Sequence, residues 1–548
     1  MSRTTTGDLW WKNALIYCLD VESFLDADGD GCGDLPGLSE RIDYLAGIGV
    51  SCLWLMPFYP SRQRDDGYDI TDFYGVDRRL GTHGDLVDMV RTARDRGMRV
   101  IADLVPNHTS DRHPWFQAAC EGRDNPYHDF YVWADEKPEE KPGDVVFPGQ
   151  EESNWAWQEQ VQRFYLHRFY SHQPDLNVAN PAVRDEIAQI AGFWLQQGLS
   201  GFRMDAVPFL IEPMGMPKGA QADPHELLRD LRRAMGRRTG EAVLLGEVNL
   251  PPADQREFFG ARGGEELDML FSFTVNQAMY LALAREEAAP LAAALRALPE
   301  IPTDCQWANF VRNHDELTLD KLAEDERAEV FAAFGPDPDM QLYGRGLRRR
   351  LPSMLDGDVA RLRMVYSMMF SLPGTPVLFY GEELGMAENL EIEGRYAVRA
   401  PMQWSAEPQA GFTEGAEPVR PVLSGGPFGF ETVNATAQRR DADSQLNWTE
   451  RLIRRRHECP ELGFGACTLL DQDDAAVFAH RVDWEDGTVV AVHNLAGRAA
   501  RASLALEGGG LLVDLFLEAE LELPGDLELA PYEGRWFRVR RPGRRLAP

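Results

Sequence analysis

The sequence predicts an α/β fold: a (β/α)8 TIM barrel with an inserted subdomain after strand three and a C-terminal all-β sandwich domain. Two observations predict the barrel. Eight short apolar runs recur between residues 14 and 381, and helical periodicity separates most of them. Strands that alternate with helices are typical of parallel βαβ units, and eight such units close a barrel. An open doubly wound sheet is the alternative, but no G-x-G-x-x-G follows the first run.

The predicted strands are rich in β-branched and aromatic residues, as buried strands are. They span residues 14–19, 51–56, 98–104, 201–207, 242–248, 268–273, 307–313 and 375–381. Helical patterns such as 84–97 and 180–198 lie between them. The barrel domain is therefore predicted to comprise residues 1–108 and 175–457.

Three segments depart from the alternation of strand and helix. Residues 109–174 are rich in aromatic residues, proline and charge and are too long for a plain loop, so they are predicted to form the inserted subdomain. Residues 316–356 are highly charged and are predicted to form a second, helical insertion. In residues 458–548 short apolar runs alternate with glycine, aspartate and proline, which indicates the C-terminal β domain.

The composition favours a soluble enzyme with a neutral small-molecule substrate. The formal net charge of −32 would repel phosphates, so no nucleic acid and no membrane partner is expected. No apolar run is long enough to span a membrane, and the N-terminus shows no secretion signal. The seven dispersed cysteines suit reduced thiols, so a cytoplasmic location is expected. No organic cofactor is expected, and the oligomeric state, homo-oligomers included, stays open.

Polar residues follow the predicted strands at the end where the active sites of barrels lie. They are Asp103, Asn107, His108, Arg203, Asp205, Glu247, His314 and Asp315. Any one of the acids alone fits a surface salt bridge or a helix cap. Three acids converging from strands four, five and seven are costly to bury without a catalytic or metal role. Asp205, Glu247 and Asp315 are therefore the predicted catalytic residues.

This set of groups suits retaining glycoside hydrolysis. One carboxylate attacks the anomeric carbon, and a protonated carboxyl about 5 Å away protonates the leaving oxygen. Arg203 lies two residues before Asp205 on the same face of a strand, so its charge is expected to keep Asp205 ionised. His108 and His314, each preceded by an asparagine, are placed to hydrogen-bond sugar hydroxyls, although a lone histidine is more often structural.

Five motifs in these stretches resemble those of the α-amylase superfamily of glycoside hydrolases, over nearly the whole chain. They are DLVPNH (103–108), QPDLN (173–177), GFRMDAV (201–207), GEVN (246–249) and NHD (313–315), in the family's order and spacing. The resemblance implies that Asp205 is the nucleophile of a covalent glucosyl intermediate, Glu247 the general acid/base and Asp315 a transition-state stabiliser. It also implies that Asp69 pairs with Arg399 at the floor of a closed pocket that takes small substrates.

Within the superfamily the chain is most similar to the trehalose synthases, which interconvert maltose and trehalose. The similar stretches are 55–74, 169–177, 305–319 and 372–386, of which NHDELTL (313–319) is the most discriminating. The chain departs at GEVNL (246–250), where trehalose synthases usually read AEANQ, and at Val178 and Ala179. The resemblance implies intramolecular glucosyl transfer. Three alternatives stay open: an α-glucosidase or trehalose hydrolase, transfer to another acceptor, and a catalytically inactive binding subunit.

The loop DADGDGCGD (26–34) is a candidate metal site. Asp26, Asp28, Asp30 and Asp34 alternate as oxygen ligands in a glycine-rich turn, with Cys32 at the remaining position, and this pattern suits Ca²⁺. The loop is not an EF-hand, because its twelfth position is Gly37. Similar loops in the α-glucosidase branch bind calcium and occasionally magnesium, which implies a structural Ca²⁺ or Mg²⁺. A plain turn without metal is the alternative.

Overall fold

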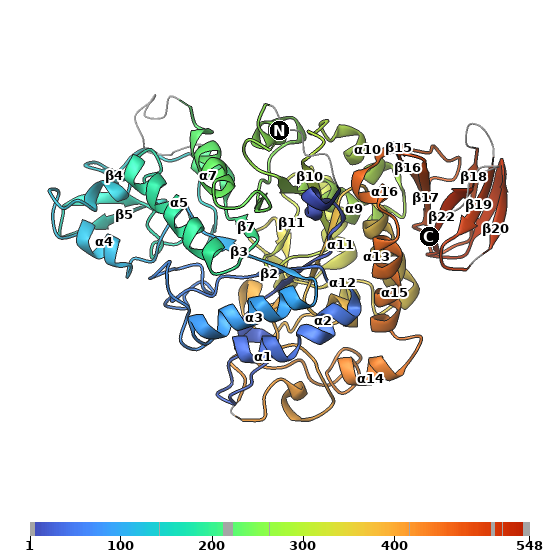
Figure 1. The fold of residues 1–548 in the computed structure, drawn as a ribbon, viewed down its shortest axis with the longest axis horizontal. Coiled ribbons are helices and arrows are strands. Elements are labelled where there is room, and N and C mark those ends of the chain that lie inside the picture. Colours follow the sequence, from blue (N-terminus) through green and yellow to red (C-terminus); the bar gives the residue numbers. More distant parts are fainter. Residues whose placement is uncertain are drawn as a thin grey trace.

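A closed barrel of eight parallel strands lies at the centre of the molecule (Figure 1). The computed structural model describes residues 6–141, 143–211, 223–261, 264–415, 417–505, 510–517 and 519–540. Around the barrel the strands follow the order β1 (Ile16–Leu19), β14 (Thr375–Phe379), β10 (Gln306–Phe310), β9 (Met269–Phe271), β8 (Val243–Gly246), β7 (Gly201–Met204), β3 (Arg99–Leu104) and β2 (Cys52–Leu55). All neighbours pair in parallel, and each strand overlaps its predicted run. The predicted (β/α)8 fold is confirmed.

The barrel strands are buried on both faces, because side chains fill the interior and helices cover the outside. Every residue of β1, β2, β7, β8 and β14 is buried. The covering helices are α1 (Leu35–Glu40), α2 (Ile42–Ile48), α3 (His83–Asp95), α5 (Pro181–Gln196), α7 (Glu226–Gly236), α9 (Phe273–Arg285), α10 (Ala289–Ala297) and α13 (Val359–Ser371), with the short α6 (Val207–Ile211) and α8 (Pro252–Gln255). This packing explains why the strands are continuous apolar runs in the sequence.

Local signals fix where the helices begin. Thr82 caps α3 in a capping box with Asp85, and Asn180 caps α5 ahead of Pro181, whose fixed φ suits a first helical turn. Each cap follows a loop at the C-terminal end of a barrel strand. The helix starts therefore define the length of the loops that carry the candidate site.

Two insertions lie at the C-terminal end of the barrel. Residues 109–174 contain α4 (Pro114–Ala119) and an antiparallel sheet of β4 (Trp133–Ala134), β6 (Arg163–Leu166) and β5 (Trp155–Gln158). Residues 316–356 were predicted to be helical. They contain α11 (Glu324–Phe334) and α12 (Leu351–Met354), but also a small sheet of β11 (Leu317–Thr318), β13 (Gly346–Leu347) and β12 (Gln341–Leu342). That sheet pairs the two ends of the insertion, which local sequence patterns do not show.

The C-terminal part packs two antiparallel sheets face to face (Figure 1). One runs β15 (Ala466–Leu469), β16 (Val477–Trp484), β17 (Gly487–Asn494), β22 (Gly534–Arg540), β19 (Gly510–Asp514) and β20 (Glu520–Leu523); the other pairs β18 (Ala500–Leu504) with β21 (Gly525–Leu529). A separate apolar cluster fills the space between the sheets. Helices α14 (Ala435–Arg440), α15 (Gln445–His457) and α16 (Glu461–Phe464) join this part to the barrel. Within the described ranges, no helix has the length and apolar character needed to cross a bilayer.

Candidate active site

The guanidinium of Arg203 binds three carboxylates at the C-terminal end of the barrel. Arg203 lies in β7 and is 1% exposed. Its Nη1 lies 2.5 Å from Oδ1 of Asp103 in β3 and 2.6 Å from Oδ1 of Asp205, which follows β7. Its Nη2 lies 2.9 Å from Oε2 of Glu247, which follows β8. Three neighbouring strands therefore bring the predicted nucleophile and the predicted acid/base to one shared cation.

Asp205 and Glu247 are tuned to titrate near neutrality. Burial raises the pKa of Asp205 to about 6, although Arg203 opposes this. Burial raises the pKa of Glu247 to about 7, and the charges of Asp205 and Asp315 add to the shift. Arg203 thus favours the ionised form of Asp205, as expected. Burial has the larger effect, so Asp205 is mainly protonated below about pH 6. Two buried carboxyl groups whose pKa values lie near neutrality suit the pairing of a nucleophile with a general acid.

Asp315 follows β10 and is held ionised by two arginines and by its contact with His314. Its Oδ2 lies 3.1 Å from Nε2 of His314, and its Oδ1 lies 2.7 Å from Nη1 of Arg395 and 3.2 Å from Nη2 of Arg399. Although burial opposes ionisation, His314 and the two arginines hold the pKa of Asp315 well below its usual range. A permanent negative charge at this place suits the stabilisation of an oxocarbenium-like transition state.

The three acids line a cavity of about 410 Å³. Its walls come from the barrel and from both insertions and include Tyr68, His108, Phe147, Phe169, Phe209, Asn249, Leu250, Arg345 and Arg395. Apolar walls with a few converging polar groups are typical of a small-molecule site. Of the other predicted site residues, His108 lines the cavity, whereas Arg203, His314 and Arg399 lie buried behind its wall.

The two predicted sugar-binding histidines are neutral. Burial lowers the pKa of His108 to about 3 and that of His314 to about 4. Nε2 of His108 lies 3.2 Å from the backbone oxygen of Tyr68, and Nε2 of His314 lies 2.8 Å from the Tyr68 hydroxyl. His108 thus lies at the cavity wall, whereas His314 lies behind it in contact with Asp315 and Tyr68.

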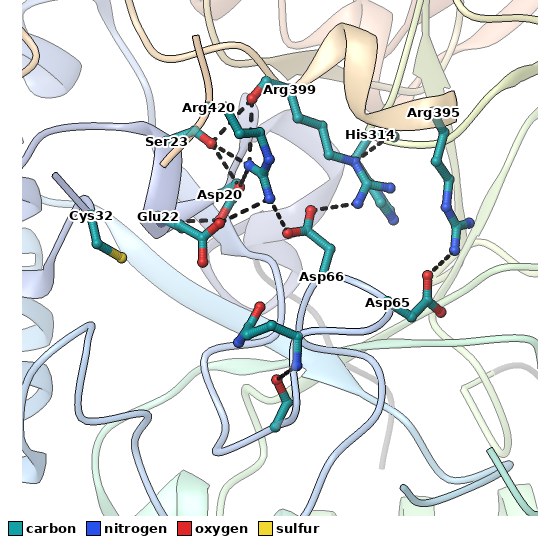
Figure 2. Close-up of polar contacts among 12 residues, drawn as sticks. Asp20, Glu22, Ser23, Cys32, Asp65, Asp66, His314, Arg395, Arg399 and Arg420 are labelled. Atoms are coloured by element: carbon teal, nitrogen blue, oxygen red, sulfur yellow. Dashed lines mark hydrogen bonds and ion pairs between the residues drawn. The ribbon is translucent and has the colours of Figure 1, made fainter. Parts of the chain in front are cut away.

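The predicted pairing of Asp69 with Arg399 is wrong. Nη1 of Arg399 lies 2.5 Å from Oδ2 of Asp66, and Nε donates to the backbone oxygen of His314 at 2.8 Å (Figure 2). Asp69 instead pairs with Arg64 at 3.2 Å. The reason is local: the backbone turns through positive φ at Asp66 and at the following glycine, so the side chain three residues before Asp69 faces Arg399.

Sequence reasoning missed three further charged residues of the site. Arg395 bridges Asp65 and Asp315 and lines the cavity, and Asp66 takes the place proposed for Asp69. The available signal was weak: Asp65 and Asp66 directly precede the GYDI stretch, and Arg395 stands four residues before Arg399. None of the three belongs to a strand, so a search for polar residues at strand ends does not find them.

The loop 26–34 brings three carboxylates together. Oxygens of Asp26, Asp28 and Asp34 lie within 4.8 Å of one another, and Asp26 and Asp34 are buried. Backbone N–H groups orient them: Oδ2 of Asp34 accepts from Ala27 at 3.0 Å. Asp30 lies outside this carboxylate cluster, and its Oδ1 accepts from the N–H of Cys32 at 2.8 Å. Converging carboxylate oxygens fit a hard cation such as Ca²⁺ or Mg²⁺.

Comparison with known proteins identifies the family. Residues 17–333 and 348–465 match the α-amylase catalytic domain. The chain is 41% identical to the trehalose synthase/amylase TreS of Mycobacterium tuberculosis, over 94% of this chain and 87% of that protein. It is 38% identical to the trehalose synthase of Pimelobacter sp. (97% and 96%).

Solved structures agree. A MutB mutant in complex with its substrate sucrose superposes with a TM-score of 0.78 at 27% identity, covering 97% of this chain and 99% of that one. The trehalose-6-phosphate hydrolase of Bacillus licheniformis gives 0.77 at 26% identity, covering 97% and 100%. Family match, barrel and relatives lead to one conclusion: this chain belongs to the α-amylase family of glycoside hydrolases and transglycosylases.

Proposed function

We propose that this enzyme interconverts maltose and trehalose by intramolecular transfer of a glucosyl group, with Asp205, Glu247 and Asp315 as its catalytic residues. The observation that carries the proposal is that these acids meet in one cavity of about 410 Å³, with Asp205 and Glu247 on a shared arginine. The similarity to several trehalose synthases over nearly the whole chain supports the choice of substrate.

The geometry suits a reaction in two displacements. Asp205 attacks the anomeric carbon of the terminal glucose while Glu247 protonates the leaving oxygen, and a glucosyl ester forms on Asp205. The ionised Asp315 stabilises the positive charge that develops on the ring. Glu247, now a carboxylate, takes the proton from the anomeric hydroxyl of the released glucose, which attacks the ester from the same face. Two inversions give net retention at the transferred carbon, and attack by the α-anomer of the released glucose gives the α,α-linked product.

The product profile from maltose tests this proposal. We expect trehalose as the main product with little glucose, because the cavity holds one small sugar beside the ester. When labelled free glucose is added, the trehalose should stay unlabelled if the transfer is intramolecular. Glucose as the sole product would instead show a hydrolase. Rapid internal cleavage of soluble starch, with long oligosaccharides first, would show an open groove and contradict the closed pocket.

Hydrolysis is the second candidate, because the sequence beside the acid/base departs from that of trehalose synthases. Leu250 lines the cavity three residues after Glu247, at the end of the GEVNL stretch that departs from trehalose synthases. The chain is also 31% identical to an α-glucosidase of Pediococcus pentosaceus, over 85% of its length. An α-glucosidase or trehalose hydrolase would form the same ester on Asp205 and admit water to it, which the product profile distinguishes.

The pH dependence of kcat/KM is expected to be bell-shaped, with its maximum between about pH 6 and about pH 7. Asp205 must be ionised to attack, so the rate falls as the pH drops below its pKa. Glu247 must be protonated to donate, so the rate falls as the pH rises above its pKa. Initial rates with maltose across the acid, neutral and mildly alkaline range measure both limbs, because the leaving glucose of maltose needs the proton from Glu247. A Glu247→Gln variant that kept the alkaline limb would contradict this assignment.

We also propose that Asp26, Asp28 and Asp34 hold a structural Ca²⁺ or Mg²⁺. Chelation should lower the melting temperature without abolishing activity at low temperature, because a ligand of the folded state alone stabilises it and the loop contributes no residue to the cavity lining. Scanning calorimetry with and without a chelator measures the shift. In the Asp28→Asn variant the chelator should cause a smaller drop in melting temperature. In the parent enzyme, re-added cation should restore the original melting temperature. An unchanged melting curve in metal-free protein would indicate a plain turn.

For its cellular context we propose a cytoplasmic enzyme whose partners are small neutral sugars. All seven cysteines are free, which suits a reducing compartment. Fractionation of the native host, with assay of trehalose formation in each fraction, tests the location.

A further inference from the structure

Arg420 is buried among acids although it belongs to no helix or strand. It lies in the irregular segment 417–434, and its side chain is 11% exposed. Nη1 lies 2.9 Å from Oδ2 of Asp20 and donates to Oγ of Ser23 at 2.6 Å. Nη2 lies 2.9 Å from Oε1 of Glu22 and also contacts Asp66 (Figure 2). One guanidinium thus connects the segment after β1 with Asp66 behind the cavity wall.

Asp66 is bracketed by two guanidinium groups. Oδ1 contacts Arg420 and Oδ2 contacts Arg399 (Figure 2). Although burial opposes it, the charges of Arg420 and Arg399 lower the pKa of Asp66 to about 2. Arg399 then reaches Asp315 at 3.2 Å. A continuous series of contacts therefore runs from Arg420 through Asp66 and Arg399 to the predicted transition-state stabiliser.

The segment that carries Arg420 is itself anchored. The N–H of Val419 donates to the backbone oxygen of Gly31 at 2.8 Å, in the loop that follows β1. The Arg420 guanidinium also lies 5.3 Å from the ring centroid of Tyr396, between Arg395 and Arg399 in the chain. Arg420 is absent from the cavity lining, so a direct contact with substrate is not its role.

We propose that Arg420 is a positioning residue for the reaction: it fixes Asp66, through Asp66 the guanidinium of Arg399, and through Arg399 the carboxylate of Asp315. The proposal rests on the proposed glucosyl transfer. Arg399 binds only Oδ2 of Asp66, whereas Arg420 binds Oδ1 and is itself held by three residues after β1, namely Asp20, Glu22 and Ser23. Catalytic groups that are displaced by about 1 Å cost a large factor in rate, so remote anchors of this kind matter.

A double-mutant cycle tests the proposal. Arg420→Met and Asp66→Asn should each lower kcat for a p-nitrophenyl α-glucoside by about 100-fold, with a smaller change in KM, because Asp315 acts in the transition state. The double variant should lose no more than the worse single variant, since both act through one series of contacts. Arg420→Lys should recover part of the loss, because an ammonium keeps the charge but not the planar fork.

Arg232→Met is the matched control. Arg232 is 9% exposed and pairs with the buried Asp268 at 2.8 Å, near the N-terminal ends of β8 and β9, away from the cavity. It should lower the melting temperature and leave kcat per folded molecule unchanged. If Arg420→Met behaved in the same way, Arg420 would only neutralise a buried acidic cluster and the proposal would be overturned.

The other outcomes of the double-mutant cycle also test the proposal. Losses that multiply in the double variant would overturn a shared route through Asp66. If Arg420→Met does not fold, unchanged kcat values in both Arg420→Lys and Asp66→Asn would overturn the proposal as well. The p-nitrophenol release reports glucosyl transfer to Asp205 whatever the acceptor is. A failure of maltose isomerisation in the parent enzyme is therefore distinguishable from a failure of the positioning role.

Discussion

Replacing Asp205 with asparagine is expected to lower kcat by at least about 10⁴-fold while the fold stays intact. The amide cannot attack the anomeric carbon, so no glucosyl ester forms. Its oxygen can still accept from Arg203, which lies 2.6 Å from the carboxylate and keeps Asp103 and Glu247 as further partners. Turnover of maltose and of a p-nitrophenyl α-glucoside, measured beside the melting temperature, checks both parts.

The two substrates separate the chemistry from leaving-group effects. The activated glucoside needs little help from Glu247, so its loss in Asp205→Asn reports the nucleophile alone. Turnover within tenfold of the parent enzyme on that substrate would sink the assignment of Asp205.

Replacing Arg399 with alanine is expected to lower kcat/KM for maltose by about 10³-fold, much more than it destabilises the protein. Arg399 is fully buried and holds Asp66, Asp315 and the backbone oxygen of His314. Its loss removes a fixed charge behind the cavity wall. The fold should survive, because Asp66 keeps Arg420 and Asp315 keeps Arg395.

Arg64→Ala is the matched control for the corrected pairing. Arg64 is the partner of Asp69, is 33% exposed and does not line the cavity. It should leave kcat/KM within about threefold, because neither Arg64 nor Asp69 lines the cavity. It should lower the stability of the protein, because the buried Asp69 loses its partner. A larger loss in Arg64→Ala than in Arg399→Ala would restore Asp69 to the pocket floor. Denaturant unfolding of both variants shows how much of each loss is stability.

The barrel and its acids follow from local features of the sequence. Parallel strands buried on both faces must be continuous apolar runs, so the eight strands are visible without any long-range information. The residue that follows such a run must lie at the C-terminal end of the barrel. This places Asp205, Glu247 and Asp315 at the same end of the barrel, and the structure brings all three to one cavity.

The sequence by itself therefore determined the fold class and the strand-end acids, because strand period and chain direction are local properties. Only the tertiary structure decided which charges meet behind the cavity wall. Asp66 faces Arg399 in place of Asp69 because two successive positive φ angles turn the loop, and side-chain direction there follows no period. Arg395 lies in a short 3-10 helix (Gly394–Val398) and Arg420 in an irregular segment, and the position of both depends on packing against the loops after β1 and β2. The rise of the Asp205 and Glu247 pKa values towards neutrality likewise comes mainly from burial, which exists only once the chain has folded.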